Sequence, residues 1–297
     1  MSASVRQRLL NRARNRREDF AWVLTRYGIE RLLYRLGRSQ YRSDFILKGA
    51  MLFPLWGIEG HRPTRDADLL GFGENTEAHL VEVFRALCEL EVEDDGLIFD
   101  SQSVQAALIR EEMEYGGIRV RLAATLGNAR IPIQVDVGFG DAVTPGPDEV
   151  DYPTLLDLPG PHLRVYSRES VIAEKFQAMI HLGMANSRMK DFYDLWMLSR
   201  LFEFEGSTLA HAIERTFSRR HTAIPAETAV FMTDEFYADA TKVTQWRAFL
   251  MRNALEEGES LETVVGAIET FLMPVSLELS AGGKFAAHWP MGGPWRR

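Results

Sequence analysis

The stretch FILKGAMLFPLWGIEGHRPTRDADLLGF, residues 45–72, places a glycine turn ahead of two alternating carboxylates. Side chains alternate between the two faces of an extended chain, so Asp66 and Asp68 are predicted to project to the same side. Paired carboxylates suit Mg2+, which prefers oxygen ligands and bridges to substrate phosphates. Gly49 lacks a Cβ, so its backbone can approach a triphosphate closely, and a helix predicted to begin there would point N–H groups at the anion.

This stretch resembles the first motif of the AbiEii and MenT nucleotidyltransferase toxins, which are small members of the polymerase β-like nucleotidyltransferase superfamily. In that family a Gly-Gly or Gly-Ser pair follows "LK", and an Arg-x-Thr-x-Asp-x-Asp run comes after it. Here RPTRDAD, residues 62–68, provides the run, and Ala50 stands where a second Gly or a Ser is usual. The resemblance implies that Asp66 and Asp68 are catalytic metal ligands. It also implies a set of nucleotide-binding residues, namely Lys48, Gly49, Ala50, Thr64 and Arg65.

A second stretch, ESVIAEKFQAMIHLGMANSRMKDFYDLWML at residues 169–198, resembles the other signature of the same family. That signature is a Glu-Lys pair on one helix, a basic turn, and Lys-Asp-x-x-Asp at the start of the next helix. In the family the Lys contacts nucleotide phosphates and the Asp belongs to the active site. The residues carried over to this chain are Lys175, Arg188, Lys190, Asp191 and Asp194.

Two explanations are open for the acidic pair of the second signature. Asp191 and Asp194 are three residues apart, so they are neighbours on one helical face, and acids in a first turn also favour the helix dipole. The dipole explains less about Asp194, which lies in an apolar run. A buried carboxylate there needs a donor, and Lys175 or Arg188 could supply it. Structural ion pairing and catalysis are both consistent with this pattern.

A third carboxylate is predicted on a strand in IPIQVDVGFGD, residues 131–141. The odd-numbered apolar residues of this segment share one face, so Asp136 is expected on the other. The segment resembles the strand that, in polymerase β-like enzymes, contributes a third carboxylate to the metal site. The alternative is an Asp that caps the turn formed by residues 138–140. Asp141, within that turn, is a weaker candidate for the same role.

Composition limits the class of protein. The chain has 297 residues, of which 46% are hydrophobic and 26% charged, values that indicate a soluble globular protein of one large or two modest domains. The single Cys88 allows neither an intramolecular disulfide nor a cysteine zinc site. We find no signal-peptide pattern and no apolar run of membrane-spanning length, so a cytoplasmic protein without a membrane partner is expected.

Charge is unevenly distributed along the chain. Residues 1–48 hold twelve Lys or Arg and four Asp or Glu, a charge of +8. Because the net charge of the whole chain is −8, the other residues together carry −16. Six arginines lie in the first seventeen positions: Arg6, Arg8, Arg12, Arg14, Arg16 and Arg17. A basic segment on an acidic body favours a phosphate-bearing partner such as RNA. The alternative is a solvated helix face that balances acidic neighbours.

The expected architecture is an α/β (α+β) protein in which a polymerase β-like nucleotidyltransferase core lies between a helical N-terminal lead and a helical C-terminal lobe. We place the basic helical lead at residues 1–48, the core at 49–145, a Pro-rich linker at 146–165 and the C-terminal lobe at 166–297. Hydrophobic periodicity predicts the following core elements: helices near 49–57 and 75–90, and strands near 66–72, 104–111, 117–126 and 131–138. Ser167 is expected to cap the first helix of the lobe.

The resemblance also implies a reaction: transfer of a nucleoside monophosphate from an NTP to an acceptor hydroxyl, with two Mg2+ ions held by Asp66, Asp68 and Asp136. The implied acceptor is the tRNA 3′ end, and a cognate antitoxin is an implied partner. Two alternatives are open. One is a nucleotidyl- or phosphotransferase acting on a protein or small molecule, and the other is a non-catalytic nucleotide-binding module.

Overall fold

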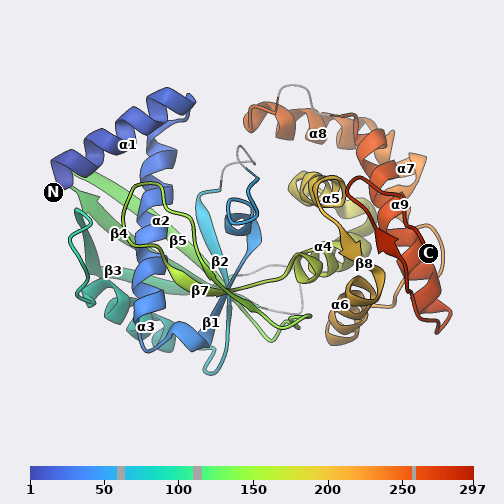
Figure 1. Cartoon of the computed structure of the whole chain (residues 1–297), viewed down its shortest axis with the longest axis horizontal. Coiled ribbons are helices and arrows are strands. Elements are labelled where there is room, and N and C mark those ends of the chain that lie inside the picture. The colour runs from blue at the N-terminus through green and yellow to red at the C-terminus, as the bar shows by residue number, and fades with distance from the viewer. Residues whose placement is uncertain (59–63, 110–115, 256–258) are drawn as a thin grey trace. The chain divides into compact units, whose positions relative to one another are not determined.

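A computed structural model describes residues 1–58, 64–109, 116–255 and 259–297. The chain divides into two compact units (Figure 1). Unit 1 contains Met1–Gly140 and Pro147–Tyr166, and unit 2 contains Asp141–Gly146 and Ser167–Arg297. Chain segments therefore alternate between the units, and a six-residue piece of unit 2 lies between two parts of unit 1.

Unit 1 is built on a seven-stranded mixed sheet with the order β3-β4-β5-β2-β1-β7-β6. Its strands are β1 (Phe45–Lys48), β2 (Asp66–Gly71), β3 (Leu97–Ile109), β4 (Gly117–Leu126), β5 (Ala129–Phe139), β6 (Asp148–Asp151) and β7 (His162–Val165). Strand β2 runs parallel to β5 and antiparallel to β1. The carboxylate strand β2 thus lies between the strand that precedes the glycine turn and the strand that carries Asp136.

The alternation predicted for β5 is confirmed. Ile131, Ile133, Val135 and Val137 are all buried, whereas Asp136 is only partly buried. The apolar face of β5 packs against α2 (Phe20–Arg38), and the two elements meet at Gly28. A Cβ on Gly28 would lie about 3.0 Å from the end of the Ile133 side chain, so the glycine permits this close packing.

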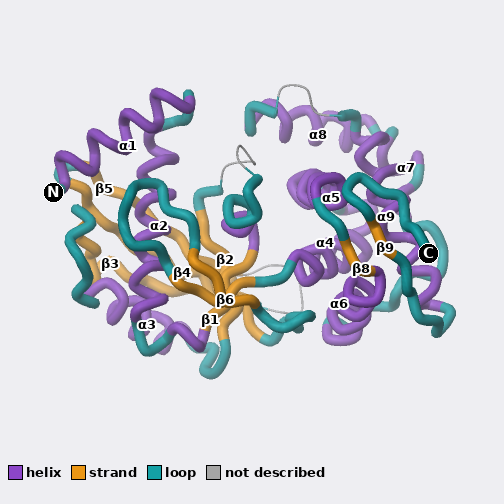
Figure 2. Tube along the Cα trace, in the orientation of Figure 1, coloured by secondary structure: helices purple, strands orange, loops and turns teal. Residues whose placement is uncertain are grey.

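The sheet of unit 1 is accompanied by α1 (Ser2–Arg16), α2 and α3 (Glu77–Glu89) (Figure 2). The side chain of Asp19 caps α2 by accepting a hydrogen bond from the N–H of Trp22. Helix α1 buries Val5 and Leu9 and packs on α2 and β4. The basic N-terminal segment is therefore a packed helix of unit 1 whose arginines, apart from the partly buried Arg12, are exposed.

Three parts of unit 1 differ from the sequence-based expectation. Residues 45–48, placed in the helical lead, form strand β1. The helix expected at 49–57 is reduced to a 3-10 turn, Gly49–Leu52, which is too short to provide a helix N-terminus for an anion. The segment 146–165, expected to be a linker, contributes β6 and β7 to the sheet, because its prolines lie outside those two short strands.

Unit 2 is helical, as expected. Its helices are α4 (Arg168–Leu182), α5 (Met189–Leu201), α6 (Gly206–Arg219), α7 (Asp234–Tyr237), α8 (Ala240–Arg252) and α9 (Leu261–Ser280). The expected cap of α4 is confirmed, because Ser167 Oγ accepts a hydrogen bond from the N–H of Ser170. Helix α4 packs on α5 and α6, and α9 packs on α5 and α6.

The C-terminal segment closes unit 2 through aromatic side chains. Strand β9 (His288–Trp289) pairs with β8 (Phe204–Glu205). Trp289 Nε1 donates a hydrogen bond to the carbonyl of Ser199 on α5, and Trp295 Nε1 donates to the carbonyl of Phe271 on α9. These tryptophans bury apolar rings and pair their N–H groups at the same time, so Trp289 fastens the C-terminal segment to α5, the helix that carries Asp191 and Asp194, and Trp295 fastens it to α9.

Helix α9 is long and apolar enough to span a membrane when judged by length and composition alone. This differs from the sequence-based expectation that the chain has no such segment. Val264, Ile268 and Phe271 are fully buried inside unit 2. The apolar character of α9 is thus accounted for by packing in a protein core.

Buried charges tie α2 to the rest of unit 1. Asp95 Oδ2 accepts hydrogen bonds from Arg31 Nε at 3.2 Å and from Arg35 Nη1 at 2.6 Å. Glu30 lies beside this pair, and its Oε2 accepts the N–H of Leu155 at 2.7 Å. Burial raises the pKa of Glu30 from 4.5 to about 7, although the Leu155 N–H and nearby arginines oppose this effect.

We expect Glu30 to make stability depend on pH. The folded state holds the Glu30 proton more tightly than the unfolded chain does. The contribution of Glu30 to the free energy of unfolding is therefore fully present below about pH 4.5 and is lost as pH rises to about 7. Glu30→Gln keeps the acceptor for Leu155 and cannot ionise. Urea unfolding from pH 5 to 8 should show a decline for the wild type that exceeds the decline for Glu30→Gln by about 2 kcal/mol. The exposed Glu82→Gln is the matched control, and an equal decline in all three proteins would contradict the assignment.

Candidate functional site

The first cluster is a row of four side chains, three of them predicted site residues, across four strands of unit 1. Sheet register pairs Lys48 on β1 with Asp68 on β2, Asp68 with Asp136 on β5, and Asp136 with Arg119 on β4. Directly paired residues project from the same face of a sheet, so these four side chains share one face. That face is opposite to the one packed on α2, because Asp136 alternates with the buried residues of β5. Two carboxylates at the centre of the row are thus flanked by one cation on each side.

Gly49 lies directly against the carboxylate of Asp68. Its φ is +72°, a left-handed conformation that favours glycine, and a Cβ built there would overlap Asp68 Oδ2. Ala50, the departure from the family pattern, is buried in the 3-10 turn that follows. The glycine therefore has two functions that a larger residue could not combine: it turns the chain, and it leaves room for Asp68.

We expect Gly49→Ala to lower activity through Asp68 as well as through backbone strain. Gly57 is a matched control, since its φ is +75° and a Cβ there would meet nothing within 4 Å. Both substitutions should reduce the free energy of unfolding by about 1 kcal/mol. Only Gly49→Ala should also lower nucleotide transfer, by about a hundredfold, because it displaces a carboxylate of the site. Equal activities of the two purified variants would contradict this role for Gly49.

Asp66, the first carboxylate of the pair, is oriented by a neighbouring hydroxyl. Thr64 Oγ1 donates a hydrogen bond to Asp66 Oδ1 at 2.6 Å. The predicted nucleotide-binding residue Arg65 is exposed, and its guanidinium lies 5.7 Å from the centre of the Trp22 ring. Arg62 and Pro63, the first residues of the same run, lie outside the described part of the chain.

Asp136, the predicted third metal ligand, is paired with an arginine of β4 in this structure. Arg119 Nε donates to Asp136 Oδ1 at 2.8 Å, and Arg119 Nη2 donates to Oδ2 at 2.6 Å. This bidentate pairing engages both carboxylate oxygens. Within residues 1–58, 64–109, 116–255 and 259–297, no three acidic, His or Cys side chains are grouped so as to hold one metal ion. In this structure Asp136 belongs to an ion pair that closes the row.

Asp66 and Asp68 fit a divalent cation without Asp136. Both are carboxylates on one face of β2, and Gly49 leaves space at Asp68. Mg2+ is commonly held by one or two carboxylates together with substrate phosphates. The donor set of β2 therefore matches the chemistry expected of the metal, with Lys48 beside it on β1 as a cation for an anionic substrate.

The second cluster lies in unit 2 and brings together the residues of the second signature. Lys175 Nζ on α4 lies 2.5 Å from Asp191 Oδ1 and 2.8 Å from Asp194 Oδ2 on α5. Asp191 and Asp194 are 1% and 0% exposed, so Lys175 supplies the donor that a buried Asp194 was expected to need. The two carboxylates hold the Lys175 ammonium in one position.

Arg188 and Lys190 complete the surroundings of Asp191. Arg188 Nε donates to Asp191 Oδ2 at 2.7 Å, whereas Lys190 is exposed. Burial raises the pKa of Asp191, but Lys175, Arg188 and Lys190 outweigh it and hold that pKa below its ordinary value of 3.8. The stability that these ion pairs contribute is therefore present above about pH 4 and is lost as pH falls further.

Three positively charged residues near the two clusters were not singled out from the sequence. Arg119 pairs with Asp136, and Lys242 Nζ donates to the carbonyl of Asn186 in the turn before α5. Arg220 Nη2 lies 2.8 Å from Asp141 Oδ1, so Asp141 anchors the segment 141–146 in unit 2. Arg119 could have been noticed, because arginines alternate with apolar residues in β4. The other two contacts join segments that are distant in sequence and have no local signal.

Comparison with known proteins gives one family match and similar solved structures. The family described as "Nucleotidyl transferase AbiEii toxin, Type IV TA system" matches residues 31–267. The crystal structure of JHP933 from Helicobacter pylori is similar with a TM-score of 0.45 and 16% identity, over 84% of this chain and 93% of that one. A putative nucleotidyltransferase from H. pylori has a TM-score of 0.44 and 15% identity, over 82% and 93%. No curated protein matches the chain.

Proposed function

Because this chain belongs to the AbiEii nucleotidyl transferase toxin family of type IV toxin–antitoxin systems, we propose that it transfers a nucleoside monophosphate from an NTP to the 3′ end of tRNA. The observation that carries the proposal is the shared face of Asp66 and Asp68 with Gly49 against the Asp68 carboxylate. The predicted mixed α/β fold with a helical C-terminal part is confirmed. An antitoxin partner follows from the family, and we propose that the protein acts in the cytoplasm.

The proposed roles follow from what holds each side chain. Thr64 orients Asp66, and Gly49 leaves the Asp68 carboxylate room beside it. These two carboxylates would hold Mg2+, which when bound offsets the charge of the triphosphate and of the attacking hydroxyl. Lys48 and Lys175 are the cations proposed to bind phosphates, and Asp191 and Asp194 position Lys175.

Transfer of radiolabel tests the proposal directly. Each α-labelled NTP is incubated in turn with the protein, Mg2+ and total tRNA, and products are separated on a denaturing gel. We expect label on tRNA with at least one NTP, and none with Asp68→Asn. Label on purified antitoxin or lysate protein, with unlabelled tRNA, would favour a protein acceptor. No transfer to any acceptor, together with NTP binding, would favour a nucleotide-binding module.

Arginines on the outer side of α1 are expected to contribute to RNA binding. Arg8, Arg14 and Arg17 are exposed, whereas Arg12 donates to the carbonyl of Leu155 and belongs to the packing of unit 1. Replacing the three exposed arginines with Gln should weaken tRNA binding. It should also reduce the salt dependence of binding by about one counterion for each phosphate that these arginines neutralise in the wild type. NTP affinity should be unchanged.

A matched triple variant controls for net charge. Arg215, Arg247 and Arg252 are exposed arginines of unit 2, and their replacement with Gln changes the charge equally. Equal loss of tRNA affinity in both triple variants would indicate a general charge effect. A lowered melting temperature with unchanged tRNA affinity in the α1 variant would instead favour pairing of these arginines with the acidic body.

A further inference from the structure

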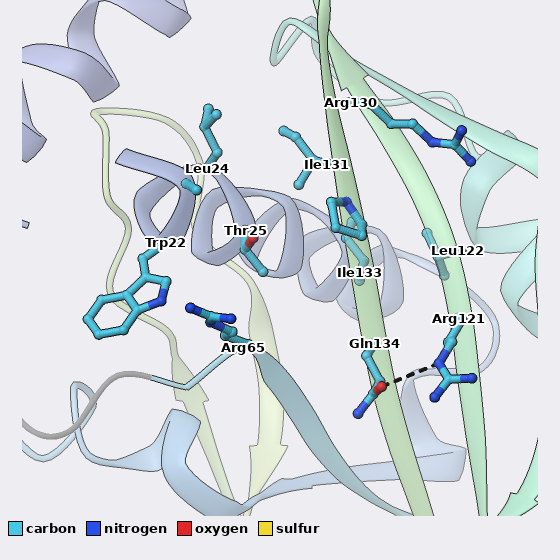
Figure 3. A pocket seen from close by; sticks show the side chains of 12 residues that line it. Trp22, Leu24, Thr25, Arg65, Arg121, Leu122, Arg130, Ile131, Ile133 and Gln134 are labelled. Atoms are coloured by element: carbon cyan, nitrogen blue, oxygen red, sulfur yellow. Dashed lines mark hydrogen bonds between the residues drawn. The ribbon is translucent and has the colours of Figure 1, made fainter. Parts of the chain in front are cut away.

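Unit 1 contains a cavity of about 400 Å³, and Arg65 is the one described residue of its lining to which a functional role was given above (Figure 3). Its walls come from the first turns of α2, from Arg65 just before β2, and from strands β4 and β5. Six polar or aromatic residues define its chemistry: Trp22, Thr25, Arg65, Arg121, Arg130 and Gln134. The volume falls within the usual range for small-molecule pockets, roughly 300–1,000 Å³.

The cavity exists because β5 extends beyond its neighbour. Strand β2 begins at Asp66, which pairs with Gln134, so residues 129–133 of β5 pair with β4 but have no partner strand on the β2 side within the described chain. Pro132 lies in this part of β5, and proline has no N–H to contribute to a ladder. The unpaired edge of β5 leaves the space that α2 and Arg65 surround.

The walls of the cavity are strongly basic for an acidic protein. The described residues that line it include three arginines and no Asp or Glu, although the chain as a whole carries −8. Arg65, Arg121 and Arg130 are exposed and form no ion pair within the described residues. The hydrogen bond between Arg121 Nε and Gln134 Oε1 is long, at 3.5 Å. Guanidinium groups with this free capacity are suited to phosphates.

An aromatic surface accompanies the arginines. Figure 3 shows Trp22 on α2 with the Arg65 side chain between it and β5. Arg121 and Arg130 extend on the other side of the β5 ribbon in the same view. A partly exposed Trp can stack on a nucleobase, while separated guanidinium groups contact the phosphates on either side of it. An isolated small anion would use the arginines but not the Trp ring.

The position of the cavity relative to β2 indicates which nucleotide it would take. Gln134 is the direct partner of Asp66, and Arg65 precedes Asp66 in the chain, so the cavity borders the first carboxylate. Lys48, proposed for the triphosphate, lies on β1 at the opposite edge of β2, and Gly49 follows it in the 3-10 turn. Donor and acceptor must approach a transferred phosphoryl group from different sides. The cavity is thus on the acceptor side of the carboxylates.

We propose that this cavity binds one nucleotide unit of the acceptor RNA strand, with its base against Trp22 and its phosphates against Arg121 and Arg130, so that the strand end is delivered to Asp66. This rests on the proposed function, because the acceptor is taken to be RNA. A free nucleotide offers the same chemistry from another source, and the experiment separates the two.

Binding is measured by fluorescence anisotropy with a labelled single-stranded RNA hexanucleotide at two salt concentrations. The test variants are the double substitution Arg121→Gln/Arg130→Gln and the single substitution Trp22→Ala. The control is Arg38→Gln/Arg85→Gln, which removes two exposed arginines of the same unit outside the cavity. We expect at least tenfold weaker RNA binding in each test variant, a smaller salt dependence only in the arginine double variant, and wild-type binding in the control.

Three results would overturn the proposal. The first is wild-type RNA binding by the Arg121→Gln/Arg130→Gln variant, whose exposed positions leave the fold intact. The second is weakened binding of free NTP with RNA binding unchanged, which would assign the cavity to a free nucleotide. The third is competition by polyglutamate as effective as by unlabelled RNA, which would indicate a general anion site. Asp68-dependent labelling of tRNA, measured separately, shows whether a failure concerns this cavity or the proposed reaction.

Discussion

Asp68→Asn is expected to lower nucleotide transfer by about a thousandfold or more and to abolish growth inhibition. Asparagine has nearly the volume of aspartate, so it fills the space beside Gly49 without the overlap that Gly49→Ala creates. It removes one of the two negative charges at the centre of the row formed by Lys48, Asp68, Asp136 and Arg119. Activity is measured with labelled NTP and tRNA, and growth is measured after induced expression.

Two controls make this result specific. Asp148→Asn changes an exposed carboxylate on β6 of the same sheet and should retain wild-type transfer. Circular dichroism and melting temperature should show that Asp68→Asn is folded. A folded Asp68→Asn protein as toxic as its parent would remove Asp68 from the catalytic machinery.

Among the substitutions proposed for this chain, Lys175→Met is expected to cause the largest decrease in the free energy of unfolding, and it is also expected to abolish nucleotide transfer. Lys175 is the cation between Asp191 and Asp194, whose side chains are 1% and 0% exposed. Removing one partner of a buried ion pair leaves an uncompensated charge and typically costs about 3–5 kcal/mol. Urea unfolding measures this change, and Lys190→Met, at an exposed position of the same turn, should change stability little.

A double variant separates the structural and catalytic roles of Lys175. Asp194→Asn removes the carboxylate that Lys175→Met leaves buried, so the Lys175→Met/Asp194→Asn protein should regain part of the lost stability. Transfer should remain lost, because the cation proposed to bind the triphosphate is still absent. Recovery of transfer together with stability would show that Lys175 acts only as a structural partner.

Local patterns in the sequence were sufficient to predict the placement of a side chain where a single helix or strand determines it. Alternation in β5 predicted which side Asp136 would take, and the spacing of Asp191 and Asp194 predicted that they share a helical face. Asp194 in an apolar run predicted a buried carboxylate that needs a donor, and Lys175 provides it. These inferences use side-chain periods of two and 3.6 residues, which depend on the backbone alone.

Features that depend on register between distant strands could not be predicted in the same way. Arg119 and Asp136 are paired because β4 and β5 align at one register, and a shift by one residue would put Arg119 on the other face. Strand β1 has only four residues between a helical stripe and the glycine turn, so its period was not visible. In the segment 146–165, the prolines predicted a linker, and the two strands β6 and β7 are too short to show a period in the sequence. The cavity at the edge of β5 depends on where β2 begins, which only the assembled sheet shows.

The path of the chain between the two units has a consequence for how such proteins can diverge. Segment 141–146 belongs to unit 2, where Asp141 pairs with Arg220 and Thr144 accepts and donates hydrogen bonds with Ser170, yet it is encoded between two parts of unit 1. A single recombination crossover near residue 166 would therefore combine the unit 2 of one parent with the 141–146 segment of the other. Exchange of the whole of unit 2 therefore requires that segment 141–146 and residues 167–297 be replaced together, which takes more than one crossover.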